Sequence, residues 1–162
     1  MKNLVLTLAL VVGMAAMASA QSSASVSVNA TLQRATLTWS ATSATLSFGT
    51  ITLPATTAQT TISTSSNSAV ALNVFGSAAC PISFSYPTTT QLTYNNANIT
   101  YTADVVGSSS NLVSAATSLG SGTLSSDGYY YIWIGGNLGS LAGTQAPGQY
   151  SGTYTITVSY GS

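Results

Sequence analysis

The chain has 162 residues, of which 45% are hydrophobic and only 2% charged, and it contains no histidine. A typical globular protein carries about a quarter charged residues, so this chain builds its polar surface from Ser, Thr, Asn and Gln instead. Without a basic patch it has no means of neutralising phosphates, which excludes nucleic acid as a partner. The low charge also removes most of the electrostatic repulsion between copies and favours association.

The N-terminal segment has the three parts of a secretory signal peptide. Lys2 supplies the positive charge, residues 4–12 form an apolar run, and Ala18-Ser19-Ala20 is typical of a cleavage site. The apolar run is too short to span a bilayer. We therefore predict a signal peptide over residues 1–20 and a mature chain that is secreted to the periplasm or cell surface without inserting into a membrane.

Period-two alternation marks both ends of the mature chain. In residues 22–32 the apolar side chains share one face, and in residues 150–160 tyrosines and aliphatic residues alternate with Ser and Thr. This period is typical of half-buried strands. The apolar face of the first segment consists of Ala24, Val26, Val28, Ala30 and Leu32.

Between these ends, shorter apolar runs alternate with turn residues, and helical periodicity is absent. Turns are predicted at Asn95-Asn96, Asp127-Gly128 and Pro147-Gly148. Many short strands with this spacing indicate an all-β antiparallel sandwich or barrel. The predicted strands are residues 35–39, 45–48, 69–75, 82–86, 91–94, 99–106 and 129–134.

The order of the strands suggests a domain that is incomplete alone. Only two residues follow the last strong strand, and the first strong strand stands directly after the signal peptide. We expect residues 21–33 to form a detachable N-terminal strand and residues 34–162 to form the sandwich. The first strand of one copy would then complete the sandwich of another.

Two stretches carry a resemblance to a known family. They are Leu46-Ser47-Phe48-Gly49 and the region from Gly135-Gly136 through Ala146-Pro147-Gly148 to Tyr154. Together they resemble the secreted bacterial domain-of-unknown-function family 4402, which is similar to spore coat U domains and archaic chaperone–usher pilins. The resemblance implies an immunoglobulin-like sandwich, donor-strand assembly into a homopolymer, and a periplasmic chaperone and outer-membrane usher as partners.

No catalytic, cofactor or metal site is expected. Asp104 and Asp127 are the only acids; the first alternates toward solvent and the second belongs to a turn, so neither is expected to serve in a catalytic pair. The serines lack a base to activate them, and calcium would need clustered carboxylates. Cys80 is alone and is expected to be a buried small hydrophobe rather than an intermolecular bridge.

One segment has binding potential. In residues 129–134, Tyr129, Tyr131 and Trp133 share one face of a predicted strand. A continuous apolar run favours a central strand buried on both faces, or an interface between subunits. Exposed, the same aromatic residues would stack on sugar rings.

Two functions follow from these observations. The leading hypothesis is a structural subunit of an extracellular fibre, pilus or surface coat that polymerises by exchange of its N-terminal strand. The alternative is a monomeric secreted carbohydrate-binding or adhesin module that uses the aromatic strand face.

The signal-peptide prediction has a direct test. The intact mass of the secreted protein should correspond to a chain that begins at Gln21, because cleavage follows the small residues at 18–20. A mass that retains the apolar segment would contradict the secretion hypothesis.

Overall fold

The computed structural model describes residues 27, 29–55 and 57–161, and it divides the chain into two compact units, residues 1–32 and 33–162. The predicted signal peptide and the first members of the predicted donor strand, Ala24, Val26 and Val28, lie outside the described residues. The remaining two members, Ala30 and Leu32, are described and exposed, and the Leu32 side chain is 96% exposed.

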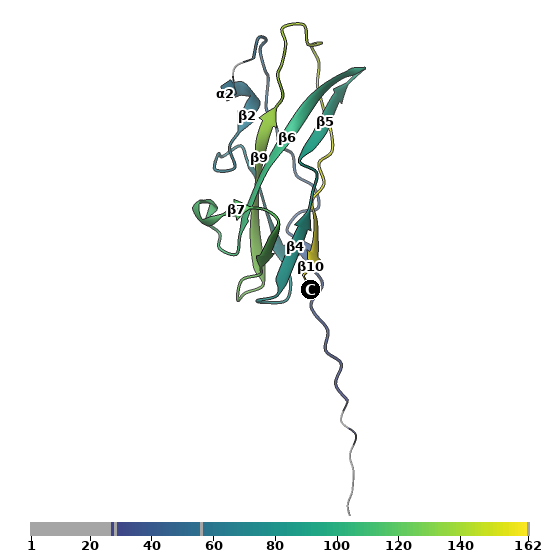
Figure 1. Ribbon diagram of the computed structural model, residues 1–162, viewed down its shortest axis with the longest axis vertical. Helices are drawn as coiled ribbons and strands as arrows, with labels where there is room; N and C mark the ends of the chain where they lie inside the picture. The colour runs from purple at the N-terminus through teal and green to yellow at the C-terminus, as the bar shows by residue number, and fades with distance from the viewer. Residues whose placement is uncertain (1–26, 28, 56, 162) are drawn as a thin grey trace, which may run out of the picture. The chain divides into compact units, whose positions relative to one another are not determined.

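The second unit contains a large antiparallel sheet, which we call sheet A (Figure 1). Its strand order is β1 (Thr38–Trp39), β3 (Val70–Phe75), β9 (Tyr129–Leu138), β6 (Ala97–Ser108) and β5 (Thr89–Tyr94). Two short strands add to it: β2 (Thr61–Ile62) pairs with the end of β9, and β7 (Thr117–Ser118) pairs with the end of β6.

A smaller sheet, sheet B, packs against sheet A. Its strand order is β10 (Thr157–Tyr160), β4 (Pro81–Ser85) and β8 (Ser121–Thr123), again antiparallel. Helical structure in the described residues amounts to the one-turn helix α2 (Thr57–Thr60) and the 3₁₀ turn η1 (Val113–Ala115). The all-β sandwich predicted from the spacing of turns is confirmed.

The core lies between the two sheets and follows from the alternation along β9. Tyr130, Ile132 and Ile134 point inward and are buried, and Ile132 is completely inaccessible. Side chains from both sheets and their connections close around them. The buried cluster consists of Val74, Ile82, Val105, Leu119, Leu124, Tyr130, Ile132 and Ile134.

Three predicted strands differ from the structure. Of residues 35–39, only Thr38–Trp39 form a strand, which is β1. Residues 45–48 form no ladder, and the C-terminal strand has its pairing confined to residues 157–160. Upstream of β10, residues 150–156 make only the isolated bridge between Ser151 and Thr93. The side-chain alternation in these segments was interpreted correctly. Alternation indicates which face of a segment is buried, but it does not indicate whether another strand pairs with that segment.

The predicted turns are mostly confirmed. Gly128 has φ +82° in the turn between β8 and β9, and Gly49 has φ +67° after Phe48, conformations that favour glycine. Gly148, in the predicted Pro147-Gly148 turn, does not have a positive φ, the conformation for which turns usually select glycine; a Cβ there would collide with the ring of Tyr94, so glycine is required for space instead. Cys80 is half-buried against the core rather than fully buried.

A polar anchor joins the last strand to the start of the domain. The Tyr160 hydroxyl donates to the Ala35 carbonyl (2.6 Å) and accepts from the Ser77 amide (2.7 Å). The Arg34 guanidinium lies 5.2 Å from the centre of the Tyr160 ring and donates to the Gly161 carbonyl at 3.4 Å. The base of the sandwich is therefore fixed where residues 33–35 enter it.

Replacing Tyr160 with Phe should lower the free energy of unfolding by about 1–2 kcal/mol, because both hydrogen bonds of the hydroxyl are lost. Denaturant unfolding measures this. Tyr94→Phe is the matched control, since the Tyr94 ring packs against Tyr150 and its hydroxyl makes no hydrogen bond among the described residues. Equal stability of the two variants would contradict the anchor.

Candidate functional site

An open groove of about 1430 Å³ runs along the sandwich. We call it the sandwich groove and define its two walls as residues 41–51 and 145–156. Its floor is the inner face of sheet A, where Ile99, Tyr101 and Leu138 form a second buried cluster. Figure 1 shows the C-terminal wall running along the sandwich into β10.

Both walls have the side-chain pattern of strands. Leu46 and Phe48 are half-buried and pack on the second cluster, while Ser47 between them is exposed. On the opposite wall Tyr154 and Ile156 are half-buried and Thr155 is exposed. Each wall thus presents apolar side chains toward sheet A and polar side chains toward solvent.

The backbone of these walls lacks the partners that strands normally have. Among the described residues, no backbone–backbone hydrogen bond involves residues 41–51 or 152–156. The Gly49 amide instead reaches the Ser47 side chain at 3.3 Å. Unpaired backbone N–H and C=O groups beside alternating apolar side chains resemble an open sheet edge, and such an edge is a template for pairing with another chain.

The strand order of sheet B shows where a further strand would fit. β4 occupies one edge of β10, and among the described residues no strand occupies the other. The C-terminal wall continues upstream from β10 along the same line. A strand added beside this wall would therefore extend sheet B over the groove and cover the apolar floor.

Two tyrosines make the interior of the groove neutral and apolar. Burial, with a smaller contribution from the charge of Asp104, raises the pKa of Tyr101 to about 12, and its hydroxyl donates to the Gly135 carbonyl at 2.5 Å. Burial also raises the pKa of Tyr154, whose hydroxyl is buried without a hydrogen-bond partner. Neither tyrosine ionises near neutral pH, so the two side chains add no charge to the groove.

The two carboxylates considered as a catalytic pair, Asp104 and Asp127, lie near opposite parts of β9. Asp104 is paired across the sheet with Gly135, whereas Asp127 lies in the turn that precedes Tyr129. Six residues of extended strand separate these positions, which is about 20 Å. The structure does not bring the two acids together.

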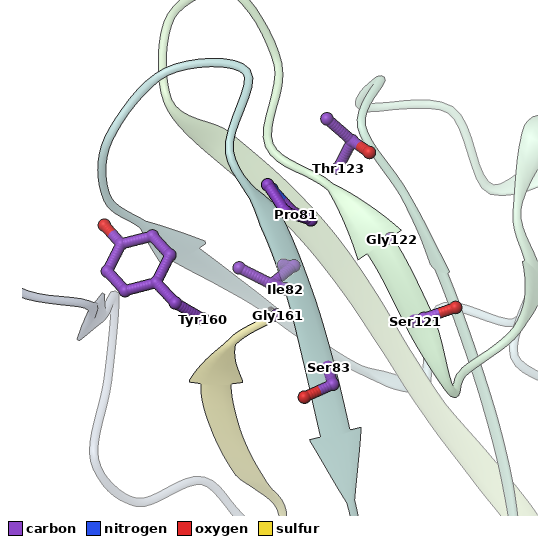
Figure 2. Close-up of a pocket in the computed structure, with 8 residues that line it drawn as sticks. All are labelled: Pro81, Ile82, Ser83, Ser121, Gly122, Thr123, Tyr160 and Gly161. Carbon is purple, nitrogen blue, oxygen red and sulfur yellow. The ribbon is translucent and has the colours of Figure 1, made fainter. Parts of the chain in front are cut away.

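A second hollow is lined by residues from all three strands of sheet B (Figure 2). Its polar side chains are the hydroxyls of Ser83, Ser121, Thr123 and Tyr160, with no carboxylate, amine or imidazole among the lining residues. Within the described ranges, no three His, Cys, Asp or Glu side chains gather into a possible metal site. Nor does that part of the chain contain a helix long and apolar enough to cross a membrane.

The sequence predicted a strand in each wall, at residues 45–48 and 150–160, but did not show the groove between them. Leu46 and Phe48 were recognised through their alternation, but nothing in the sequence showed that the segment lacks a neighbour. The predicted aromatic residues lie elsewhere: Tyr129, Tyr131 and Trp133 are on the outer face of sheet A, away from the core.

The fold and the groove define a class: an all-β antiparallel sandwich domain with an open sheet edge. The chain belongs to the family called domain of unknown function DUF4402, whose family model matches residues 25–160. Comparison with curated proteins found no match, and comparison with solved structures found none either.

Hydrogen exchange tests the open edge. In the isolated subunit, the amides of residues 43–48 and 152–156 should exchange at rates close to those of an unfolded chain, because they have no backbone acceptor. The amides of β9 that pair with β3 and β6 should be strongly protected and serve as the internal control. Protection of the groove walls equal to that of β9 would contradict the open edge.

Proposed function

We propose that this protein is a structural subunit of an extracellular fibre, pilus or surface coat, and that it polymerises by donating its N-terminal strand. Residues 22–32 of one copy enter the sandwich groove of the next and become an additional strand of sheet B. The observation that carries the proposal is the groove itself, which combines an apolar floor with walls whose backbone, over residues 41–51 and 152–156, has no backbone partner among the described residues.

The N-terminal segment has the chemistry that such a groove requires. Its apolar face consists of small and medium side chains that alternate with Ser, Asn and Thr. Leu32, the largest of them, is 96% exposed, so its apolar surface is available for burial. The family model begins at residue 25, which places most of this segment inside the pattern that defines the family.

The energetics favour a long-lived assembly. Burying one valine contributes roughly 1.5–3 kcal/mol, and each ladder hydrogen bond adds about 0.5–1.5 kcal/mol. Residues 22–32 extend over roughly 36 Å, enough to run beside the C-terminal wall and β10 together. Strand addition also closes an edge that would otherwise promote unspecific aggregation.

The cellular setting of the proposal comes from the sequence. A signal peptide directs the chain out of the cytoplasm, and the low charge limits repulsion between identical subunits in a fibre. The resemblance to spore coat U domains and archaic chaperone–usher pilins supports assembly at the cell surface, with a periplasmic chaperone and an outer-membrane usher as partners.

Val28→Arg should abolish polymers while leaving export intact, because a charge would enter the groove without a partner. Ser27→Arg is the matched control: it adds the same charge one residue away, on the solvent face of the strand, and should polymerise normally. Light scattering and negative-stain images of the secreted proteins measure the result. Strand donation is wrong if both variants polymerise like the parent chain, or if the parent chain is a stable monomer.

Peptide complementation separates the groove from other effects of the substitution. A synthetic peptide of residues 21–33, added to the Val28→Arg subunit, should raise its melting temperature and protect the amides of residues 152–156 from exchange. The same peptide with Val28→Arg should do neither, whereas the Ser27→Arg peptide should act like the parent. Equal effects of all three peptides would contradict a specific site.

A further inference from the structure

A row of three aromatic rings lies along the outer face of sheet A. The alternation of β9 buries Tyr130, Ile132 and Ile134 in the core and turns the intervening side chains outward. Ring centres are 6.2 Å apart from Tyr129 to Tyr131, and 6.4 Å apart from Tyr131 to Trp133. The planes of successive rings differ by only 22° and 26°. We call Tyr129, Tyr131 and Trp133 the aromatic ladder.

The three aromatic side chains of the ladder are not part of the hydrophobic core of the sandwich. The three side chains lie on the face of β9 opposite to the core, and Tyr129 is 37% exposed. Phe75 extends the apolar surface from the neighbouring strand, with its ring centre 5.1 Å from that of Tyr129 and 43% of the residue exposed. The run of apolar residues in β9 is therefore buried on one face and partly open on the other.

The polar ends of the ladder are unused. Within the described part of the chain, the hydroxyls of Tyr129 and Tyr131 and the indole N–H of Trp133 make no hydrogen bond. Tyr and Trp are enriched at interfaces, where the apolar ring and the polar end of the side chain can both be used. A sugar ring can use both, since its C–H face stacks on an aromatic ring and its hydroxyls accept and donate hydrogen bonds.

The neighbours of the ladder specify the charge of the partner. Asn73 and Ser108 stand directly across from Tyr131 on the two adjacent strands and add uncharged hydrogen-bonding groups. Asp127 precedes the ladder in the turn before β9, and Asp104 stands across from Gly135, two residues beyond Trp133. Acidic groups at both ends repel an anionic chain, so the surface suits an uncharged one.

We propose that the aromatic ladder binds a neutral polysaccharide, whose successive sugar units stack along β9. A flat protein surface is the other candidate partner, because protein interfaces are also enriched in Tyr and Trp. The regular row of three nearly parallel rings favours instead a chain of repeating units. The proposal does not depend on strand exchange. In a fibre, repetition of the ladder in every subunit would raise the overall avidity for a polymer without any new contact.

The test uses the secreted mature protein and its monomeric Val28→Arg variant, with defined neutral probes: oligosaccharides of cellulose, xylan and chitin. Titration monitored by tryptophan fluorescence, with affinity electrophoresis in the polymers, should detect at least one of them. Tyr131→Ala and Trp133→Ala should each weaken binding about tenfold or more, as expected for loss of one stacked ring. Tyr131→Phe keeps the ring and should lose less.

Controls make each outcome decisive. Thr102→Ala changes an outward-facing residue of β6 beyond the ladder, across from Asn137, and should leave binding unchanged. Polygalacturonate, an acidic polymer, should bind more weakly than the neutral probes. Binding by the monomeric variant supports the ladder even if strand exchange fails. The proposal is overturned if no neutral probe binds, if Tyr131→Ala binds like the parent, or if that variant changes only the association between copies.

Discussion

Backbone N–H and C=O groups in an extended segment need partners, and this constraint governs the structure. Most strands of the sandwich meet it through antiparallel ladders, with β9 held between β3 and β6. Over residues 41–51 and 152–156, the walls of the sandwich groove make no backbone–backbone hydrogen bond among the described residues, because no described strand lies beside them. Their side chains nevertheless pack on the core as those of ordinary strands do. A domain built in this way has room for one further strand. The proposed function, polymerisation by strand donation, is based on this room.

The central strand β9 separates the two surfaces that matter for function. One face of β9 supplies the buried residues at the centre of the core, and the other carries the aromatic ladder. Because successive side chains of a strand point to opposite faces, a run of six apolar residues serves both purposes without interruption. The sandwich groove opens on the inner side of sheet A and the ladder lies on its outer side. Occupation of one surface therefore leaves the other accessible.

The scarcity of charge shapes both proposals. Arg34 is the only cation of the predicted mature chain, and it is engaged with Tyr160 and Gly161 at the base of the domain. The remaining surface is rich in hydroxyl and amide groups, which hydrate well but repel weakly. Such a surface permits identical subunits to come together, and it suits an uncharged polymer better than an acidic one.

The amino-acid sequence by itself determined the class of fold. Period-two alternation and turn chemistry indicated an all-β sandwich, and most of the predicted strands and turns are present. Alternation also placed Tyr130 inward and Tyr131 outward correctly, because side-chain direction depends on local backbone geometry. The Asp127-Gly128 turn was identified from the same kind of local information, since positive φ is a property of a single residue.

The tertiary structure alone decided which strands have neighbours. Residues 45–48 and 150–156 have the pattern of strands, yet the groove between them becomes visible only when the sheets are assembled. Hydrogen-bond partners come from segments distant in sequence, and alternation within one segment carries no information about them. The same reason explains Gly148, whose need for glycine comes from the ring of Tyr94 rather than from its own backbone. Local periodicity fixed the direction of each side chain, and long-range pairing fixed where the sandwich was left open.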